Sequence, residues 1–376
     1  MKRFGWLLVL LLAAVPAWSA KKVTVAELRE MLASMHKESK DDEAVAAALK
    51  QVQMSEELDR NAMNNLGEYV PGQLATEQLY VLEARSAMFA PPASDIPTAA
   101  APDAASQKTI LDKAETYATK TYDQLPALTA NKTIRRFQDN AEVATPAAGN
   151  PKDTTVVNPW QFVRYINVAS TDVSSEHGVE KLPADKDKTP WGKNNMIAIQ
   201  QPDASLSQVF QEAKGGGTIN WLRWETVGGK QLAVFSFDVP KKKSHLALNI
   251  CCFPNSGQSL VARVASDNLS QDETVYHNYK TVVPYHGEFF VDPEGGTVVR
   301  MITIAGLKSS EVVHQQDTRI DYGPMTVGDK TLIVPVKAFI NTEVVPNGDT
   351  SSSRPITRCT LFTSEYKDYK LAGSAK

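Results

Sequence analysis

The spacing of apolar residues changes once along this chain, near residue 125. Before that point, apolar side chains recur every three or four positions, which is the period of a helix that packs through one face. After it, apolar and polar residues alternate, and Gly, Pro and Asn interrupt the alternation, which is typical of strands joined by turns. A chain with its helices first and its strands afterwards is expected to be α+β, with an antiparallel sheet.

The first twenty residues have the three parts of a secretory signal peptide. Met1–Arg3 is basic, Leu7–Val15 is apolar, and Pro16–Ala20 supplies small residues for cleavage. The apolar part is less than half of the ~20 residues that a membrane-spanning helix needs. We therefore expect residues 1–20 to be removed and the mature protein to be exported, to the periplasm or the extracellular space, with no membrane span after cleavage. The alternative is a buried N-terminal helix.

The charge balance argues against nucleic acid as a partner. The chain has 40 basic and 43 acidic residues, and loss of Lys2 and Arg3 would change the net charge from −3 to −5. Nucleic-acid binders concentrate basic residues on one face, and a mildly acidic chain does not predict such a face.

Residues 21–125 are expected to form a helical region. Thr24 and Glu27 have the spacing of a capping box, in which each side chain bonds the backbone amide of the other residue. Further helices are expected after Asp41 or Asp42, after Ser55, after Pro71 and near Asp103. Each is too short to be stable alone in water, so the helices must pack on one another or on the sheet. The stretch 90–105 is rich in Pro and Ala and indicates an extended linker.

Residues 126–376 are expected to form about ten antiparallel strands, either as a sandwich or as one curved sheet that curls into a barrel or half-barrel. A flat sheet of about ten strands would be unusual, and strands that follow one another directly favour a meander that curls. One helix after Asp203, with Leu206, Val209 and Phe210 on its apolar side, interrupts the strands. The candidate strands are 132–138, 161–169, 218–226, 230–239, 244–253, 281–291, 297–305, 318–327, 331–340 and 356–366.

No arrangement of residues predicts catalysis, a cofactor or a metal. A Gly-x-Ser-x-Gly nucleophile motif does not occur, and Gly215–Gly217 lacks the Lys-Ser or Lys-Thr of a phosphate-binding loop. His177 stands near Asp172, Glu176 and Glu180, but this spacing fits no established metal site and favours a solvated loop. We therefore expect a non-enzymatic protein with no catalytic, cofactor-binding or metal-binding residues.

Two tryptophans and three cysteines are candidates for structural or binding roles. Trp221 and Trp224 are three positions apart in one predicted strand, so we expect them on opposite faces of the sheet. Core packing and the lining of a concave pocket are both open to them. Cys251 and Cys252 are adjacent in a strand, so only one could reach Cys359, and Cys252 is the candidate for a disulfide. The alternative is that all three are apolar core residues with free thiols.

Two segments resemble a known family. Tyr285–Arg300 is a strand that ends in Val-Asp-Pro, followed by a Gly turn and a strand containing Val-Val-Arg. This segment looks like a hairpin of LolA/LolB-like lipoprotein carriers, and Ile320–Pro324 with Val327–Val336 is similar to the way those sheets continue. The resemblance implies a half-barrel with an apolar concavity, no catalytic residues, and a lipid or acyl ligand. The candidate lining residues are Trp221, Trp224, Phe235, Phe289 and Val291.

The chain also resembles a set of uncharacterised secreted proteins from acidobacteria. The shared features are the Pro-Pro-x-x-x-Ile-Pro segment at Pro91–Pro97, the Trp-x-x-Trp-Glu strand at Trp221–Glu225, and the later Ser244-His245 and Cys251-Cys252 pairs. This resemblance covers most of the chain and implies no function.

The sequence thus supports two hypotheses from different classes. The first is an exported, non-enzymatic carrier or sensor for a lipid or lipoprotein. The alternative is a structural or protein-interaction module of the envelope, in which the helical region is a docking arm for an envelope protein.

Overall fold

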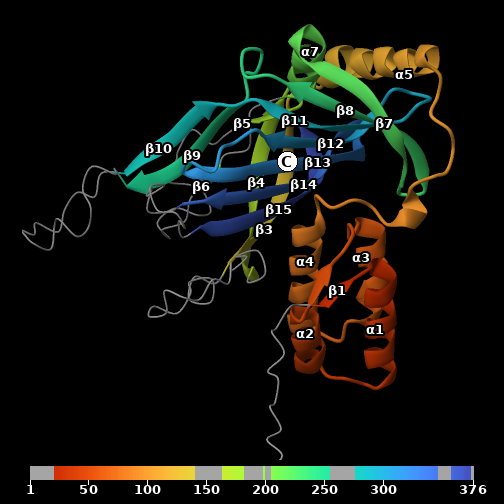
Figure 1. Cartoon of the computed structure of the whole chain (residues 1–376), viewed down its shortest axis with the longest axis vertical. Helices are drawn as coiled ribbons and strands as arrows, with labels where there is room; N and C mark the ends of the chain where they lie inside the picture. The colour runs from red at the N-terminus through yellow and green to blue at the C-terminus, as the bar shows by residue number, and fades with distance from the viewer. Residues whose placement is uncertain are drawn as a thin grey trace, which may run out of the picture.

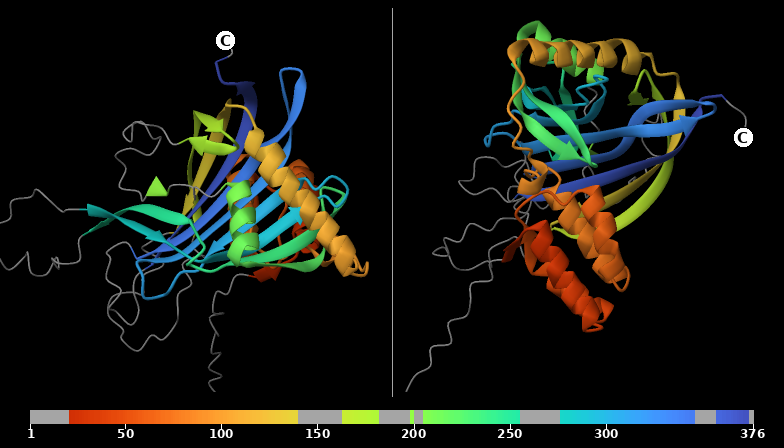
Figure 2. Two further views of the ribbon diagram at one scale, coloured as in Figure 1. Left: turned by 90° about the horizontal axis from the view of Figure 1, so that it is seen from above. Right: turned by 90° about the vertical axis from the view of Figure 1, so that its right-hand side faces the viewer.

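The computed structural model describes residues 21–139, 163–181, 198–199, 205–254, 276–345 and 357–373. The predicted signal peptide and Asp203 lie outside these residues. The described part is α+β, with a large antiparallel sheet between two helical layers (Figure 1). Two helices lie on one face of the sheet and the N-terminal helical region lies against the other, as the turned views also show (Figure 2).

The N-terminal region forms a small helical unit with its own core. Its helices are α1 (Val25–Lys37), α2 (Asp42–Lys50), α3 (Arg60–Leu66) and α4 (Gln73–Ser86). The predicted capping box is confirmed, because the Glu27 amide donates to Thr24 Oγ1 at 3.2 Å and the Thr24 amide donates to Glu27 Oε2 at 2.8 Å. Strands β1 (Lys21–Val23) and β2 (Val52–Met54) pair in parallel. The buried core includes Leu28, Leu32, Val45, Leu49, Leu66 and Leu79.

The main sheet has ten strands in the order β5-β4-β3-β15-β14-β13-β12-β11-β8-β7, all paired antiparallel. Neighbours along the chain are mostly neighbours in the sheet, which is the predicted meander. Two pairings depart from it: β3 pairs with β15 and so joins the first long strand to the last, and β8 pairs with β11 although two strands of another sheet lie between them in the chain. The bounds are β3 (Leu128–Gln138), β4 (Arg164–Glu176), β5 (Val179–Lys181), β7 (Thr218–Val227), β8 (Lys230–Val239), β11 (Tyr285–Val291), β12 (Val298–Ala305), β13 (Val313–Val327), β14 (Lys330–Val344) and β15 (Arg358–Leu371).

A second sheet has three strands in the order β10-β9-β6. Their bounds are β6 (Ala198–Ile199), β9 (Ala247–Pro254) and β10 (Tyr276–Val282). The strand predicted over 281–291 is therefore two strands in different sheets, because the chain turns at Val283 and Pro284. Proline has no amide hydrogen for the ladder, and strands commonly end beside it.

The inner face of the main sheet is the one that α5 (Ala104–Thr116) and α7 (Leu206–Gly216) cover (Figure 2). It carries the largest apolar core, to which Phe235, Tyr285, Phe289, Met301 and Ala338 contribute. The outer face carries the alternate residues of the same strands, including Val234, Phe290, Arg300, Arg319 and Lys337. Because successive side chains of a strand point to opposite faces, the sheet has one apolar face and one face that carries both apolar and charged side chains.

Candidate functional site

The inner face is filled by aromatic side chains beneath α7. Phe210 of α7 stacks on Phe289 of β11 with ring centroids 4.0 Å apart, and Phe237 lies 4.4 Å from the same ring. Phe235, Phe289 and Val291, which the sequence predicts to line a ligand site, are fully buried in this core. They lie on the predicted face, and side chains of the protein itself occupy the space above them.

Trp221 and Trp224 lie on the same inner face, so the prediction of opposite faces is wrong. The pairing of β7 with β8 shifts register between Trp221 and Arg223, which is a β-bulge at Leu222. A bulge adds one residue to one strand and reverses the alternation beyond it. The two indole rings are therefore 4.8 Å apart, and Trp221 is 5.4 Å from Phe235. The structure thus brings all five predicted lining residues to one face.

Besides the apolar face of α7, polar contacts near the helix ends join the cover helices α5 and α7 to their surroundings. Lys113 of α5 donates to the Glu294 carbonyl at 3.0 Å, and Lys214 of α7 pairs with Glu115 of α5. Trp224 Nε1 donates to the Ala100 carbonyl at 2.9 Å, which attaches the 90–105 segment to β7. The apolar attachment of α5 itself consists of the buried Ile110 and Ala114 and the partly buried Leu111.

Glu212 of α7 is a buried acidic residue that the sequence analysis did not identify. Tyr285 Oη donates to Glu212 Oε2 at 2.9 Å, and the His245 amide donates to the same oxygen at 3.1 Å. Burial, together with the hydrogen bond to Glu212, raises the pKa of Tyr285. The helical spacing of Glu212 with Gln208, which donates to it at 2.7 Å, is the only local signal for this contact in the sequence.

The acidic residues around His177 do not form a metal site. Glu180 accepts two hydrogen bonds from Lys132 Nζ at 2.9 Å and one from Tyr366 Oη at 2.9 Å, while His177 Nδ1 lies 2.9 Å from the Asp123 carbonyl. Within the described residues, no group of three or more His, Cys, Asp or Glu side chains is placed to hold a metal ion.

The outer face carries a buried network of ion pairs that joins it to the helical region. Glu57 lies 2.6 Å from Arg319 Nη1 and 3.2 Å from Arg300 Nη1, and Asp321 lies 2.7 Å from Arg300 Nε and 2.9 Å from Arg319 Nη2. Burial alone would raise the pKa of Asp321, but attraction to the two guanidinium groups outweighs it and holds that pKa well below its usual range. These strands and Glu57 are more than two hundred residues apart in the chain.

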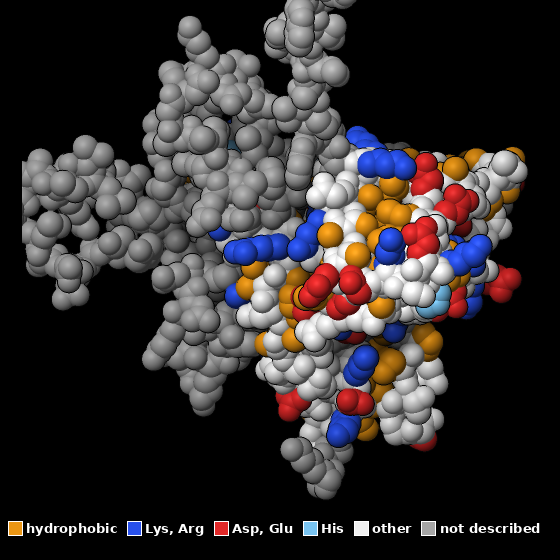
Figure 3. Space-filling model, turned by 90° about the horizontal axis from the view of Figure 1, so that it is seen from below, with side chains coloured by type: hydrophobic (Ala, Val, Ile, Leu, Met, Phe, Trp, Pro, Cys, Tyr) orange, Lys and Arg blue, Asp and Glu red, His pale blue; other side chains and the backbone are white. Residues whose placement is uncertain are grey.

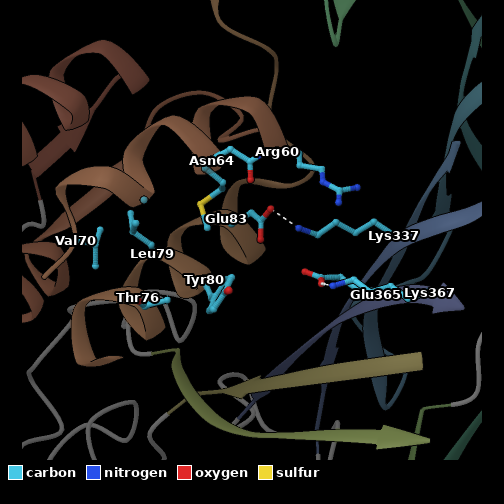
Figure 4. Close-up of a pocket in the computed structure, with 12 residues that line it drawn as sticks. Arg60, Asn64, Val70, Thr76, Leu79, Tyr80, Glu83, Lys337, Glu365 and Lys367 are labelled. Carbon is cyan, nitrogen blue, oxygen red and sulfur yellow. Dashed lines mark hydrogen bonds and ion pairs between the residues drawn. The ribbon is translucent and has the colours of Figure 1, made fainter. Parts of the chain in front are cut away.

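A second contact between the two layers surrounds a cavity of about 380 Å³. Figure 4 shows Glu83 of α4 pointing across this cavity to Lys337 of β14, with Glu365 and Lys367 beside it. Glu83 and Lys337 are both buried. The helical region is thus held on the sheet by charged pairs that are largely buried.

Charges of both signs are mixed on the described part of the lower surface, over the helical region (Figure 3). Hydrophobic side chains are interspersed among them. In the described residues, no helix is both long enough and apolar enough to cross a membrane.

Cys359 carries a buried thiol that is free among the described residues, and the predicted disulfide with Cys252 stays a prediction. It points to the outer face and packs with Phe137, Leu361 and Val81 of α4. The backbone of β9, which includes Cys252, belongs to the three-stranded sheet, and Ile250 of β9 packs on the inner-face residues Val313 and Val344. The side chain of Cys252 lies outside the described residues.

Comparison with known proteins yields one structural similarity. The chain is similar to the crystal structure of a LolA superfamily protein from Nitrosomonas europaea, with 11% sequence identity, 71% of this chain and 94% of that chain covered, and a TM-score of 0.23. No protein-family model and no curated protein matches the sequence. The functional argument therefore rests on the geometry of the chain itself.

Proposed function

We propose that this chain is an exported, non-enzymatic binding protein that takes up an acyl chain on the inner face of its half-barrel, beneath α5. The observation that carries the proposal is the apolar inner face beneath a helix that buries few side chains. Burial of an acyl chain contributes about 0.8 kcal/mol per CH₂ group, so an apolar surface is sufficient to bind it. No reactive group is needed.

Displacement of α5 is the step that would open the inner face. Only Ile110 and Ala114 of its thirteen residues are buried, and it continues into a π-helical turn at Tyr117–Thr121. A helix of this length is marginal in isolation, and π-helical turns often occur at functional sites. An entering acyl chain would replace the contacts of Ile110 and Ala114 with contacts of its own.

The test uses a stearic acid with a nitroxide near its methyl end, which quenches nearby tryptophan. We expect the mature protein to bind it, with quenching of Trp221 and Trp224 that disappears in the W221F/W224F variant although binding persists. Ala114→Glu places a charge against the sheet and loosens α5, so it should increase uptake of the probe. Ala105→Glu, at an exposed position of the same helix, is the matched control.

Native mass spectrometry of protein purified from its own envelope provides the second readout. An acyl species at fixed stoichiometry is expected. A clean apo mass, together with no quenching of Trp221 or Trp224, would contradict the proposal.

A further inference from the structure

A second cavity, on the opposite side of the sheet from the inner face, has the character of a ligand site. It has a volume of about 570 Å³ and lies where β2 and α4 meet β13 and β14. Ligand pockets in proteins are typically ~300–1,000 Å³. The residues that line it come from both layers and include Lys22, Met54, Leu82, Arg85, Phe89 and Asn341.

Among the described residues that line this cavity, Arg85 is the only arginine, and no acidic side chain neutralises its charge. Its guanidinium makes no hydrogen bond or ion pair with any described residue, and burial lowers its pKa to about 10. The other lining cation is Lys22, and no Asp or Glu is among the lining residues. A partly desolvated cation without a partner costs free energy, which an anion in the cavity would offset.

The paired cations of the same junction show that this is a local feature. Three other cations are buried where the helical region contacts the sheet, and each has an acidic partner. Arg300 and Arg319 pair with Glu57 and Asp321, and Lys337 pairs with Glu83. Arg85 lies two positions from Glu83 on α4 but faces the cavity, with no acidic residue opposite it. Among the described residues, the fold thus supplies a counter-charge to each of these three buried cations but not to Arg85.

A second polar group of the cavity lining, independent of Arg85, is the buried amide of Asn341. Its side chain is only 6% exposed, lines the cavity, and its Oδ1 has no hydrogen-bond partner. Buried polar groups in proteins are almost always hydrogen-bonded. The oxygen would accept from a hydroxyl group or a water, and the amide nitrogen of the same side chain could donate to an anionic oxygen.

The cavity also has an apolar part, beside the polar side chains of Gln53, Ser55, Ser86, Gln315 and Asn341. Leu82, Arg85 and Phe89 are spaced three and four positions apart and so share one face of α4 and the turn that follows it. Met54 and Met88 add flexible thioether side chains, which adapt to irregular ligands. Phe89 is 45% exposed and stands at the edge. The cavity thus combines the positive charge of Arg85 with an apolar surface along Leu82, Met54 and Phe89.

We propose that this cavity binds an amphiphile with one anionic head and a short alkyl chain, the head on the Arg85 guanidinium and the chain against Leu82, Met54 and Phe89. A carboxylate and a phosphate monoester share this chemistry, since a guanidinium binds either through two parallel hydrogen bonds. The site is separated from the inner face by the sheet and does not depend on the function proposed above.

The test is calorimetric titration of the mature protein with decanoate, decyl phosphate, decanol and acetate. Decanoate and decyl phosphate are expected to bind, and their order of affinity identifies the natural head group. Decanol lacks the anionic head and acetate lacks the alkyl chain, so each should bind at least about tenfold more weakly than decanoate. Equal binding of acetate and decanoate would overturn the alkyl part of the proposal.

Arg85→Gln should weaken decanoate binding about tenfold or more and leave decanol binding unchanged. Arg29→Gln, at an exposed position of α1, should change neither and serves as the matched control. Without ligand, the R85Q variant should melt at the same temperature as the parent or higher, because it loses an unpaired buried charge. Decanoate affinity that is the same in R85Q and in the parent would overturn the proposal, and would assign that binding to another surface such as the inner face.

Discussion

Asp317 is buried and Asp321, four positions further along β13, is half-buried, and the pKa values of their carboxyl groups are shifted in opposite directions. Two guanidinium groups contact Asp321, and their attraction outweighs the effect of burial. Asp317 has one hydrogen bond, from Gln315 Nε2, and His286 nearby. Burial therefore dominates and raises the pKa of Asp317 to about 6. The supply of counter-charge, and not burial alone, decides the ionisation of each residue.

Asp317→Asn should stabilise the protein at neutral and higher pH. Because the folded-state pKa of about 6 lies above the unfolded value, the folded state binds the proton more tightly, and the free energy of unfolding falls as pH rises from about 4 to about 6. The variant avoids this loss. We expect a gain of up to about 3 kcal/mol at about pH 8 and almost none at about pH 4.

Urea unfolding at the two pH values measures the difference. Asp329→Asn removes the same charge from the exposed turn between β13 and β14 and should have almost no effect. If D317N were no more stable than the parent at the higher pH, Asp317 would not be the buried acid that limits stability there.

At the scale of elements, α4 begins without a capping side chain of its own. Its N-cap is Gly72, and the two carboxylate oxygens of Asp42 accept from the amides of Leu74 and Ala75, each at 2.9 Å. Asp41 caps α2 through the Ala44 amide at 2.8 Å. The choice between Asp41 and Asp42 that the sequence left open is thus resolved, since one caps its own helix and the other caps α4.

Asp42→Ala should destabilise the helical region by about 1–2 kcal/mol, because two amides lose their acceptors and the start of α4 loses a favourable negative charge. Asp42→Asn, which keeps one oxygen acceptor, should cost about half as much. Gly72→Ala should also be destabilising, because an added Cβ would lie 2.5 Å from Asp42 Oδ2. Urea unfolding followed by far-UV circular dichroism measures all three, and equal stability of D42A and the parent would refute the cap.

For the whole molecule, the attachment of the helical region to the sheet depends on buried ion pairs. The region has its own core, and the 90–105 segment that leaves it contacts β7. The network of Glu57, Arg300, Arg319 and Asp321, with the separate Glu83–Lys337 pair, joins it to the outer face. The hypothesis that this region is a docking arm for an envelope protein stays a prediction, and any partner would meet it in this attached position.

Glu83→Gln alone should cost about 3 kcal/mol, because it removes the hydrogen-bonded counter-charge of the buried Lys337 and leaves only the attraction of Glu365. The double variant E83Q/K337M should recover most of that loss, since replacing both charges removes the unpaired one. Thermal unfolding gives the coupling energy, and protease cleavage within residues 90–105 reports detachment. Additive losses in the double variant would show that the two charges do not stabilise each other.

Local patterns alone determined much of the architecture. The capping box at Thr24 is confirmed, and α5 begins directly after Asp103, whose side chain accepts from the Ser106 amide at 2.7 Å. The alternation of strand residues predicted the curved antiparallel sheet, and nine of its ten strands overlap a predicted one, β5 being the exception. These features follow from interactions among residues a few positions apart, which the order of residues specifies directly.

Other features became visible only in the folded chain. The bulge at Leu222, which places both tryptophans on one face, depends on the register with β8 and has no signature in β7 itself. The partners of Glu57 and Glu83, and the lack of one for Arg85, depend on how a helical region packs against strands more than two hundred residues away. The sequence specifies which charges exist, but only the tertiary structure decides which of them meet and which are left facing a cavity.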